Sequence, residues 1–91
     1  MRVSVVSIAR NDAKARMPDE VVYDVETKID THTRRFEVVV ASGLIGSHQV
    51  PHATFRDPAD LRVFRHDQRP ITDILRGVLD IYNREQAVLP A

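Results

Sequence analysis

The chain has 91 residues, and its 13 basic side chains balance 13 acidic ones, so it has no net field to attract nucleic acid or an anionic membrane. We take residues 1–91 as a single small domain with a thin core. The absence of cysteine excludes disulfides, thiolate metal sites and cysteine nucleophiles. No stretch is long and apolar enough for a signal peptide or a membrane span, so we expect a cytoplasmic protein.

Strands are predicted in the first half of the chain. Residues 2–8 are rich in valine and predict a first strand. Apolar and polar side chains alternate over 21–30 and 35–42, which predicts a hairpin with one polar face. A further strand over 47–50 would make a sheet of four strands instead of three. It would be short and at an edge, because Pro51 donates no ladder hydrogen bond.

The charges of the hairpin favour one register. A two-residue turn at 31–32 would set Glu26 against Glu37, and like charges directly opposite are destabilising. A four-residue turn over 31–34 avoids this clash, so we expect the longer turn and a polar face satisfied by its own cross-strand ion pairs. The predicted pairs are Lys28 with Glu37, Asp30 with Arg35, Val25 with Val40, and Ile29 with Phe36.

A short helix is predicted over 58–65. Asp57 fits its N-cap and Pro58 its first position, since proline lacks an N–H that would have no partner there. Leu61 and Phe64 are expected to anchor this helix to the rest of the protein.

The last helix, over 70–86, has the strongest pattern in the chain. Its apolar residues fall within an arc of about 160°: Ile71, Ile74, Leu75, Val78, Leu79, Ile81 and Tyr82. Gly77 flanks the arc, and a glycine inside a helix points to a close approach to another backbone. These elements predict an α+β fold, in which an antiparallel sheet of three or four strands carries both helices on one face.

Histidines are the only candidate acid–base or metal-binding residues that we single out. His48 and His52 have the spacing of two ligands on a helix, but Pro51 lies between them in an extended stretch. In a strand their Cα atoms would be roughly 13 Å apart, too far to share one metal ion. We therefore expect no metal site, no cofactor and no catalytic group. An enzyme using a histidine as acid or base is the third hypothesis for function.

The second hypothesis is an RNA- or DNA-binding module, because arginine pairs with phosphate and stacks on bases. The candidate contacts are Arg34, Arg35, Arg56, Arg62, Arg65 and Arg69. Interleaved aspartates at 57, 60 and 67 leave the stretch around them almost neutral, whereas a nucleic-acid footprint should be basic.

The first hypothesis is a small non-catalytic protein-interaction or regulatory module with an unknown protein partner. The broad apolar arc of the last helix exceeds what one sheet can cover. Zero net charge also removes repulsion between copies. We therefore expect a two-fold homodimer, the commonest symmetric assembly of soluble proteins.

Overall fold

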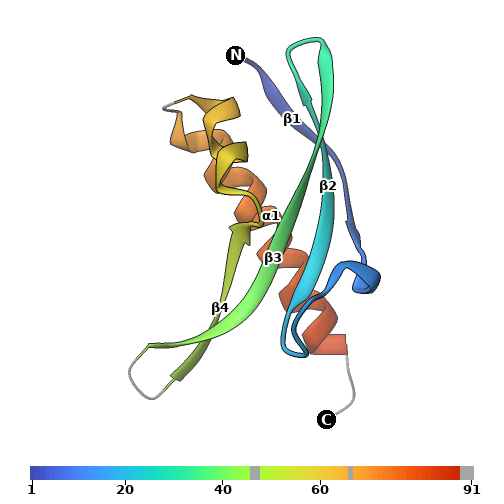
Figure 1. Ribbon diagram of the computed structural model, residues 1–91, viewed down its shortest axis with the longest axis vertical. Coiled ribbons are helices and arrows are strands. Elements are labelled where there is room, and N and C mark those ends of the chain that lie inside the picture. Colours follow the sequence, from blue (N-terminus) through green and yellow to red (C-terminus); the bar gives the residue numbers. More distant parts are fainter. Residues whose placement is uncertain (46–47, 66, 89–91) are drawn as a thin grey trace.

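The computed structural model describes residues 1–45, 48–65 and 67–88, and it confirms the α+β fold. Four antiparallel strands lie in the sheet in chain order, and helix α1 crosses one face of that sheet (Figure 1). The elements are β1 (Val3–Arg10), the 3₁₀ turn η1 (Asp12–Lys14), β2 (Val21–Ile29), β3 (His32–Ile45), β4 (His48–Phe55), the 3₁₀ helix η2 (Pro58–Phe64) and α1 (Gln68–Val88).

The core lies between α1 and the face of the sheet that α1 covers, which we call the α1 face. Alternate residues of β2 and β3 point into this core, as the sequence predicts, because successive side chains of a strand alternate between faces. Phe36, Phe55 and Phe64 meet there, with ring centroids 5.4 to 6.0 Å apart. This aromatic cluster joins β3, β4 and η2.

The predicted hairpin register is wrong. Ile29 pairs with His32, so the turn consists of Asp30 and Thr31, and Asp24 stands opposite Glu37. Asp30 takes a left-handed φ of 54° and is held by Arg2, whose N–H donates to its carboxylate over 2.9 Å. The expected ladder of ion pairs is also wrong, because among the described residues no ion pair joins β2 to β3 directly.

Strand β4 is twice as long as predicted, because Pro51 does not end it. The N–H of Arg56, just after the strand, donates to the carbonyl of Glu37 over 2.9 Å. Because bonded and non-bonded pairs alternate along an antiparallel ladder, Pro51 opposite Ser42 is a non-bonded pair. Its missing N–H would therefore point away from β3, to the open edge of the sheet. The prediction of an edge position for this strand is confirmed.

The connections before and within the helical region differ in detail from the prediction. The carboxylate of Asp57 accepts from the N–H of Ala59 over 3.0 Å, which confirms Asp57 as an N-cap, but η2 is a 3₁₀ helix. α1 begins two residues before Pro70. Asp67 accepts from the N–H of Arg69 over 3.1 Å and so satisfies one of the donors of the first turn. None of the described helices is long and apolar enough to cross a membrane.

Leu61 and Leu75 are less buried than the apolar residues three positions after them. Phe64 is fully buried, whereas Leu61, which we expected to anchor the same short helix, is 38% exposed. On α1, Val78 is fully buried and Leu75 only half-buried. The apolar arc of α1 is therefore covered along its centre, and part of it remains at the surface beside β4.

The second face of the sheet, which we call the open face, is crossed by the connection between β1 and β2. A guanidinium nitrogen of Arg56, next to β4, donates to the carbonyl of Lys14 over 3.1 Å. β1 and β4 are opposite edges of the sheet, so this bond shows that the connection spans the open face. On the open face Val22 is fully buried, although its side chain points away from the main core.

Candidate functional site

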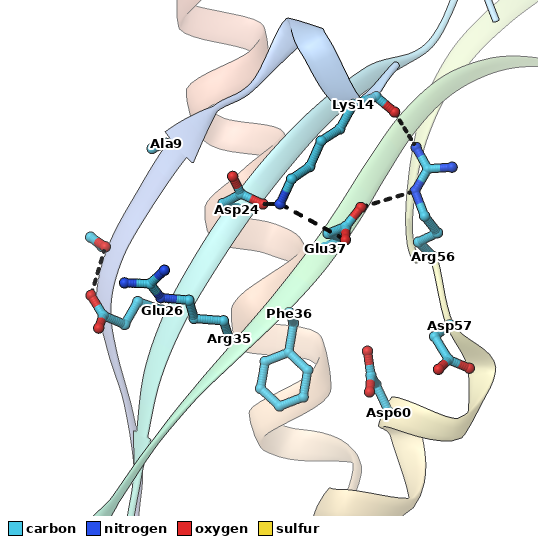
Figure 2. Close-up of a pocket in the computed structure, with 11 residues that line it drawn as sticks. Ala9, Lys14, Asp24, Glu26, Arg35, Phe36, Glu37, Arg56, Asp57 and Asp60 are labelled. Carbon is cyan, nitrogen blue, oxygen red and sulfur yellow. Dashed lines mark hydrogen bonds and ion pairs between the residues drawn. The ribbon is translucent and has the colours of Figure 1, made fainter. Parts of the chain in front are cut away.

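A charged hollow of about 450 Å³ lies on the open face, where β4 leaves the sheet (Figure 2). Lys14 reaches into it from η1, and Arg56 enters from the end of β4. Three cationic and five anionic side chains line the hollow: Lys14, Arg35 and Arg56, with Asp24, Glu26, Glu37, Asp57 and Asp60.

Most charges on one side of this hollow satisfy one another. Arg56 pairs with Glu20 over 2.6 Å, and these two side chains are only 15% and 13% exposed. Nε of Arg56 is 3.3 Å from a carboxylate oxygen of Glu37. Nζ of Lys14 lies 2.7 Å from Asp24 Oδ1 and 3.9 Å from Glu37 Oε2. Cations from outside the hairpin therefore neutralise the like-charge pair that the register creates.

The pKa values follow from these contacts. The hydrogen bond from Lys14 is the main cause that lowers the pKa of Asp24, and Asn11 adds a second bond over 3.0 Å. The pKa of Glu20 is lowered, first by the backbone N–H of Arg16 and then by the guanidinium of Arg56. All these bonds favour the ionised carboxylates and tie the β1–β2 connection to the sheet.

The opposite wall of the hollow is acidic. Burial raises the pKa of Asp60, and the neighbouring Asp57 carboxylate raises it further. Within residues 1–45, 48–65 and 67–88, no group of three histidine, aspartate or glutamate side chains is placed to hold a metal ion. The contacts of the hollow are those of a structural ion network that fixes the β1–β2 connection.

The six arginines proposed for nucleic acid do not gather on one face. Arg34 lies on the α1 face, with its guanidinium 6.0 Å from the ring centroid of Phe36, and Arg35 projects from the opposite face of the same strand. Arg56 is mostly buried and already paired. The remaining three are exposed in the helical region: Arg62 in η2, Arg65 directly after it, and Arg69 in the first turn of α1.

The histidines of β4 lie on an extended strand, as the sequence predicts. His48 and His52 are both exposed on the open face, four residues apart. The ring of His52 covers Gly43, since a Cβ added to that glycine would lie 2.9 Å from His52 Cδ2. This close approach explains a glycine near the end of β3, and it gives His52 a packing role.

The outer edge of β4 has backbone groups without partners in the sheet. The hydrogen bond between Arg56 and Glu37 fixes which pairs of the β3–β4 ladder are bonded. The backbone N–H and carbonyl groups of the non-bonded residues therefore point away from β3; these residues are Gln49, Pro51, Ala53 and Phe55. Among the described residues, no hydrogen bond outside the regular elements uses the backbone of 49–55. The edge therefore presents three N–H groups and four carbonyls.

An apolar groove, which we call the β4 groove, runs beside this edge between β4 and the helices. It consists of two hollows of about 400 and 330 Å³ that share Leu75. Thr54, Phe55, Pro58, Leu61, Arg65, Gln68 and Ile71 complete the first hollow, and Pro51, His52, Ala53, Thr72, Arg76 and Leu79 complete the second. Figure 1 shows β4 at the border of the sheet, with η2 and the start of α1 beyond its end.

The rim of the β4 groove is basic. Arg65 belongs to one hollow and Arg76 to the other, and none of the described residues that line them is a carboxylate. Neither arginine forms an ion pair with another described residue. Lys14 and Arg56, on the open face, are in contrast each paired with carboxylates.

Arg65 is a candidate nucleic-acid contact in the sequence, where the β4 groove itself is not predicted. The signal was present in the width of the apolar arc, because Leu75 and Leu79 belong to it and line the groove. Leu61, interpreted as an anchor, is the other part of this signal.

Comparison of the chain with protein-family models, with curated proteins and with solved structures found no match, so the geometry described above carries the functional argument alone.

Proposed function

We propose that this chain is a non-catalytic protein-interaction module that binds an extended segment of a partner protein as an additional strand beside β4. One observation carries the proposal: the outward backbone groups of β4 run along an apolar groove. In strand addition, main-chain hydrogen bonds supply affinity, and pockets for alternate side chains supply selectivity. The β4 edge offers the first and the β4 groove the second.

Nucleic-acid binding is a weaker proposal. Its candidate arginines are divided between two faces, Arg56 is already paired, and the chain as a whole has no net charge. A steep salt dependence of binding to a generic oligonucleotide would support it. An enzyme ranks below both, because among the described residues no salt bridge joins His48 or His52 to a carboxylate.

The two-fold dimer expected from the sequence is a separate proposal. A sheet edge with unpaired backbone groups is a surface on which copies can associate. Sedimentation equilibrium at micromolar concentration tests it, since a mass near 10.3 kDa over the whole range would exclude self-association.

Selection from a displayed random-peptide library tests strand addition. Selected peptides should slow hydrogen exchange of the Ala53 and Phe55 amides and shift the signals of α1 residues in the groove. The variant Ala53→Pro removes one outward N–H without removing a donor to β3, and it should bind these peptides at least tenfold more weakly. Leu61→Gln alters only an exposed lining residue and should weaken binding too. Peptides whose signals map to β1 or the open face would refute the proposal.

A further inference from the structure

The faces of β4 determine which side chains of an added strand enter the β4 groove. Residues opposed in an antiparallel ladder lie on the same face of the sheet. Pro51, Ala53 and Phe55 face α1, so partner residues opposite them would point into the groove. Partner residues between these positions would lie on the open face, beside His52 and Thr54. Apolar side chains therefore fit at three alternate positions and polar ones between them.

The two arginines of the groove add a charge requirement. Arg65 and Arg76 are exposed, belong to different hollows and have no carboxylate to pair with among the described residues of the lining. A neutral partner strand would bring no carboxylate to either arginine inside the groove. Carboxylates on the partner would complement them, and complementary charges increase both association rate and selectivity.

We infer that the β4 groove accepts an acidic extended segment of another protein, with apolar residues at alternate positions and carboxylates that pair with Arg65 and Arg76. This inference rests on the strand addition proposed above. It deepens that proposal by stating the chemistry of the partner. The backbone hydrogen bonds of β4 alone could pair with a segment of any sequence.

A second copy of the chain fits this groove less well. Two copies joined along β4 about a two-fold axis would bring Arg76 of each copy to one interface. Among the described residues that line the groove, no carboxylate could separate these positive charges. Charge complementarity therefore favours an acidic partner over self-association at this edge.

Synthetic peptides of about nine residues test the inference. The acidic probe has valine or isoleucine at three alternate central positions, threonine between them and two glutamates at each end. A matched probe replaces every glutamate by glutamine, and a third replaces them by lysine. Affinity for the full chain is measured by calorimetry at about 20 mM and about 500 mM salt, because screening weakens contacts between exposed charges.

The acidic probe should bind about five- to tenfold more tightly than the glutamine probe at low salt, and the lysine probe most weakly. The difference between the first two should disappear at high salt and in the double variant Arg65→Gln/Arg76→Gln. Arg69→Gln is the matched control, since Arg69 is also exposed in the helical region but does not line the groove. It should leave the difference unchanged.

The outcomes separate this inference from the proposed function. Equal binding of the acidic and glutamine probes, both lost in Ala53→Pro, would keep strand addition and overturn the acidic requirement. Binding of no probe would overturn both. A dimer that Ala53→Pro dissociates and that excludes the acidic probe would show that a second copy occupies the groove, and it would likewise overturn the inference.

Discussion

Asp24 and Glu37 stand opposite each other on β2 and β3 although both carry negative charge. Their pair is of the non-bonded type, in which opposed side chains lie closest. Lys14 places its ammonium 2.7 Å from the first carboxylate and 3.9 Å from the second. A residue outside the hairpin therefore neutralises the like charges that its register brings together.

Lys14→Met should destabilise the protein at pH 7, because it keeps the apolar stem and leaves two carboxylates opposed. The folded-state pKa of Asp24 is lowered, so the contribution of this contact is present above the unfolded pKa of about 3.9 and is lost as pH falls through the folded value. The pKa of Lys14 is raised by the same bond, so the contribution is also lost in strong alkali. Denaturant unfolding at several pH values measures this window.

Lys28→Met is the control for that experiment. Lys28 is exposed on the face of β2 that also carries Asp24. It stands opposite Thr33 and forms no ion pair with a described residue. Its loss should have little effect at any pH. Adding Asp24→Asn to Lys14→Met should restore part of the stability, and equal losses for Lys14→Met and Lys28→Met at pH 7 would contradict the bridging role.

Phe64→Ala should destabilise the protein by about 3–5 kcal/mol, because it empties one corner of the aromatic cluster. Leu61→Ala, in the same short helix, should cost less than about 1 kcal/mol, since this side chain is partly in solvent. Thermal or denaturant unfolding gives both values. Similar losses would mean that η2 packs through both residues, as the sequence led us to expect.

Gly77→Ala should stabilise the protein by about 0.5–1 kcal/mol. A Cβ at this position would lie 3.4 Å from Ile8 Cδ1, an ordinary contact, so the helix gains alanine propensity without a clash. Gly77 therefore approaches a side chain, and not the backbone that we expected. Gly43→Ala is the contrasting change, because its Cβ would lie 2.9 Å from His52. It should lower the unfolding midpoint, and a stabilising Gly43→Ala would contradict the packing of His52.

Val78→Ala should cost about 1–3 kcal/mol, since Val78 is fully buried in the centre of the α1 arc. Leu75→Ala should cost about 1–2 kcal/mol, less than a fully buried leucine, because Leu75 lies half-exposed in the β4 groove. Only Leu75→Ala should also weaken peptides that bind along β4. A reversed order in both measurements would show that the groove is not where we place it.

Local patterns predicted which side chains of the hairpin face the core, because alternation along a strand needs no information from elsewhere. They failed on register, since the cations that neutralise its like-charge pair, Lys14 and Arg56, lie outside the hairpin. Likewise, the effect of Pro51 depends on which side of its strand is paired, and that follows from a contact of Arg56.

The candidate site was predictable only in part. The apolar arc of α1 indicates more surface than one sheet can cover, but the position of the uncovered part depends on where β4 runs and where η2 turns. In a 3₁₀ helix, residues three apart share one side, so Leu61 and Phe64 look alike in sequence. The fold sends Phe64 to the core and leaves Leu61 over the groove.

The position of Pro51 also bears on the solubility of the protein. A chain without net charge and with an accessible strand edge is at risk of edge-to-edge aggregation and fibril growth. Two β4 strands laid side by side would bring a proline from each into the new ladder, and each would leave an acceptor without its donor. A single foreign strand, as proposed above, would meet only one proline, whereas two copies of β4 would meet two, so Pro51 makes β4 a poor template for stacking copies of itself.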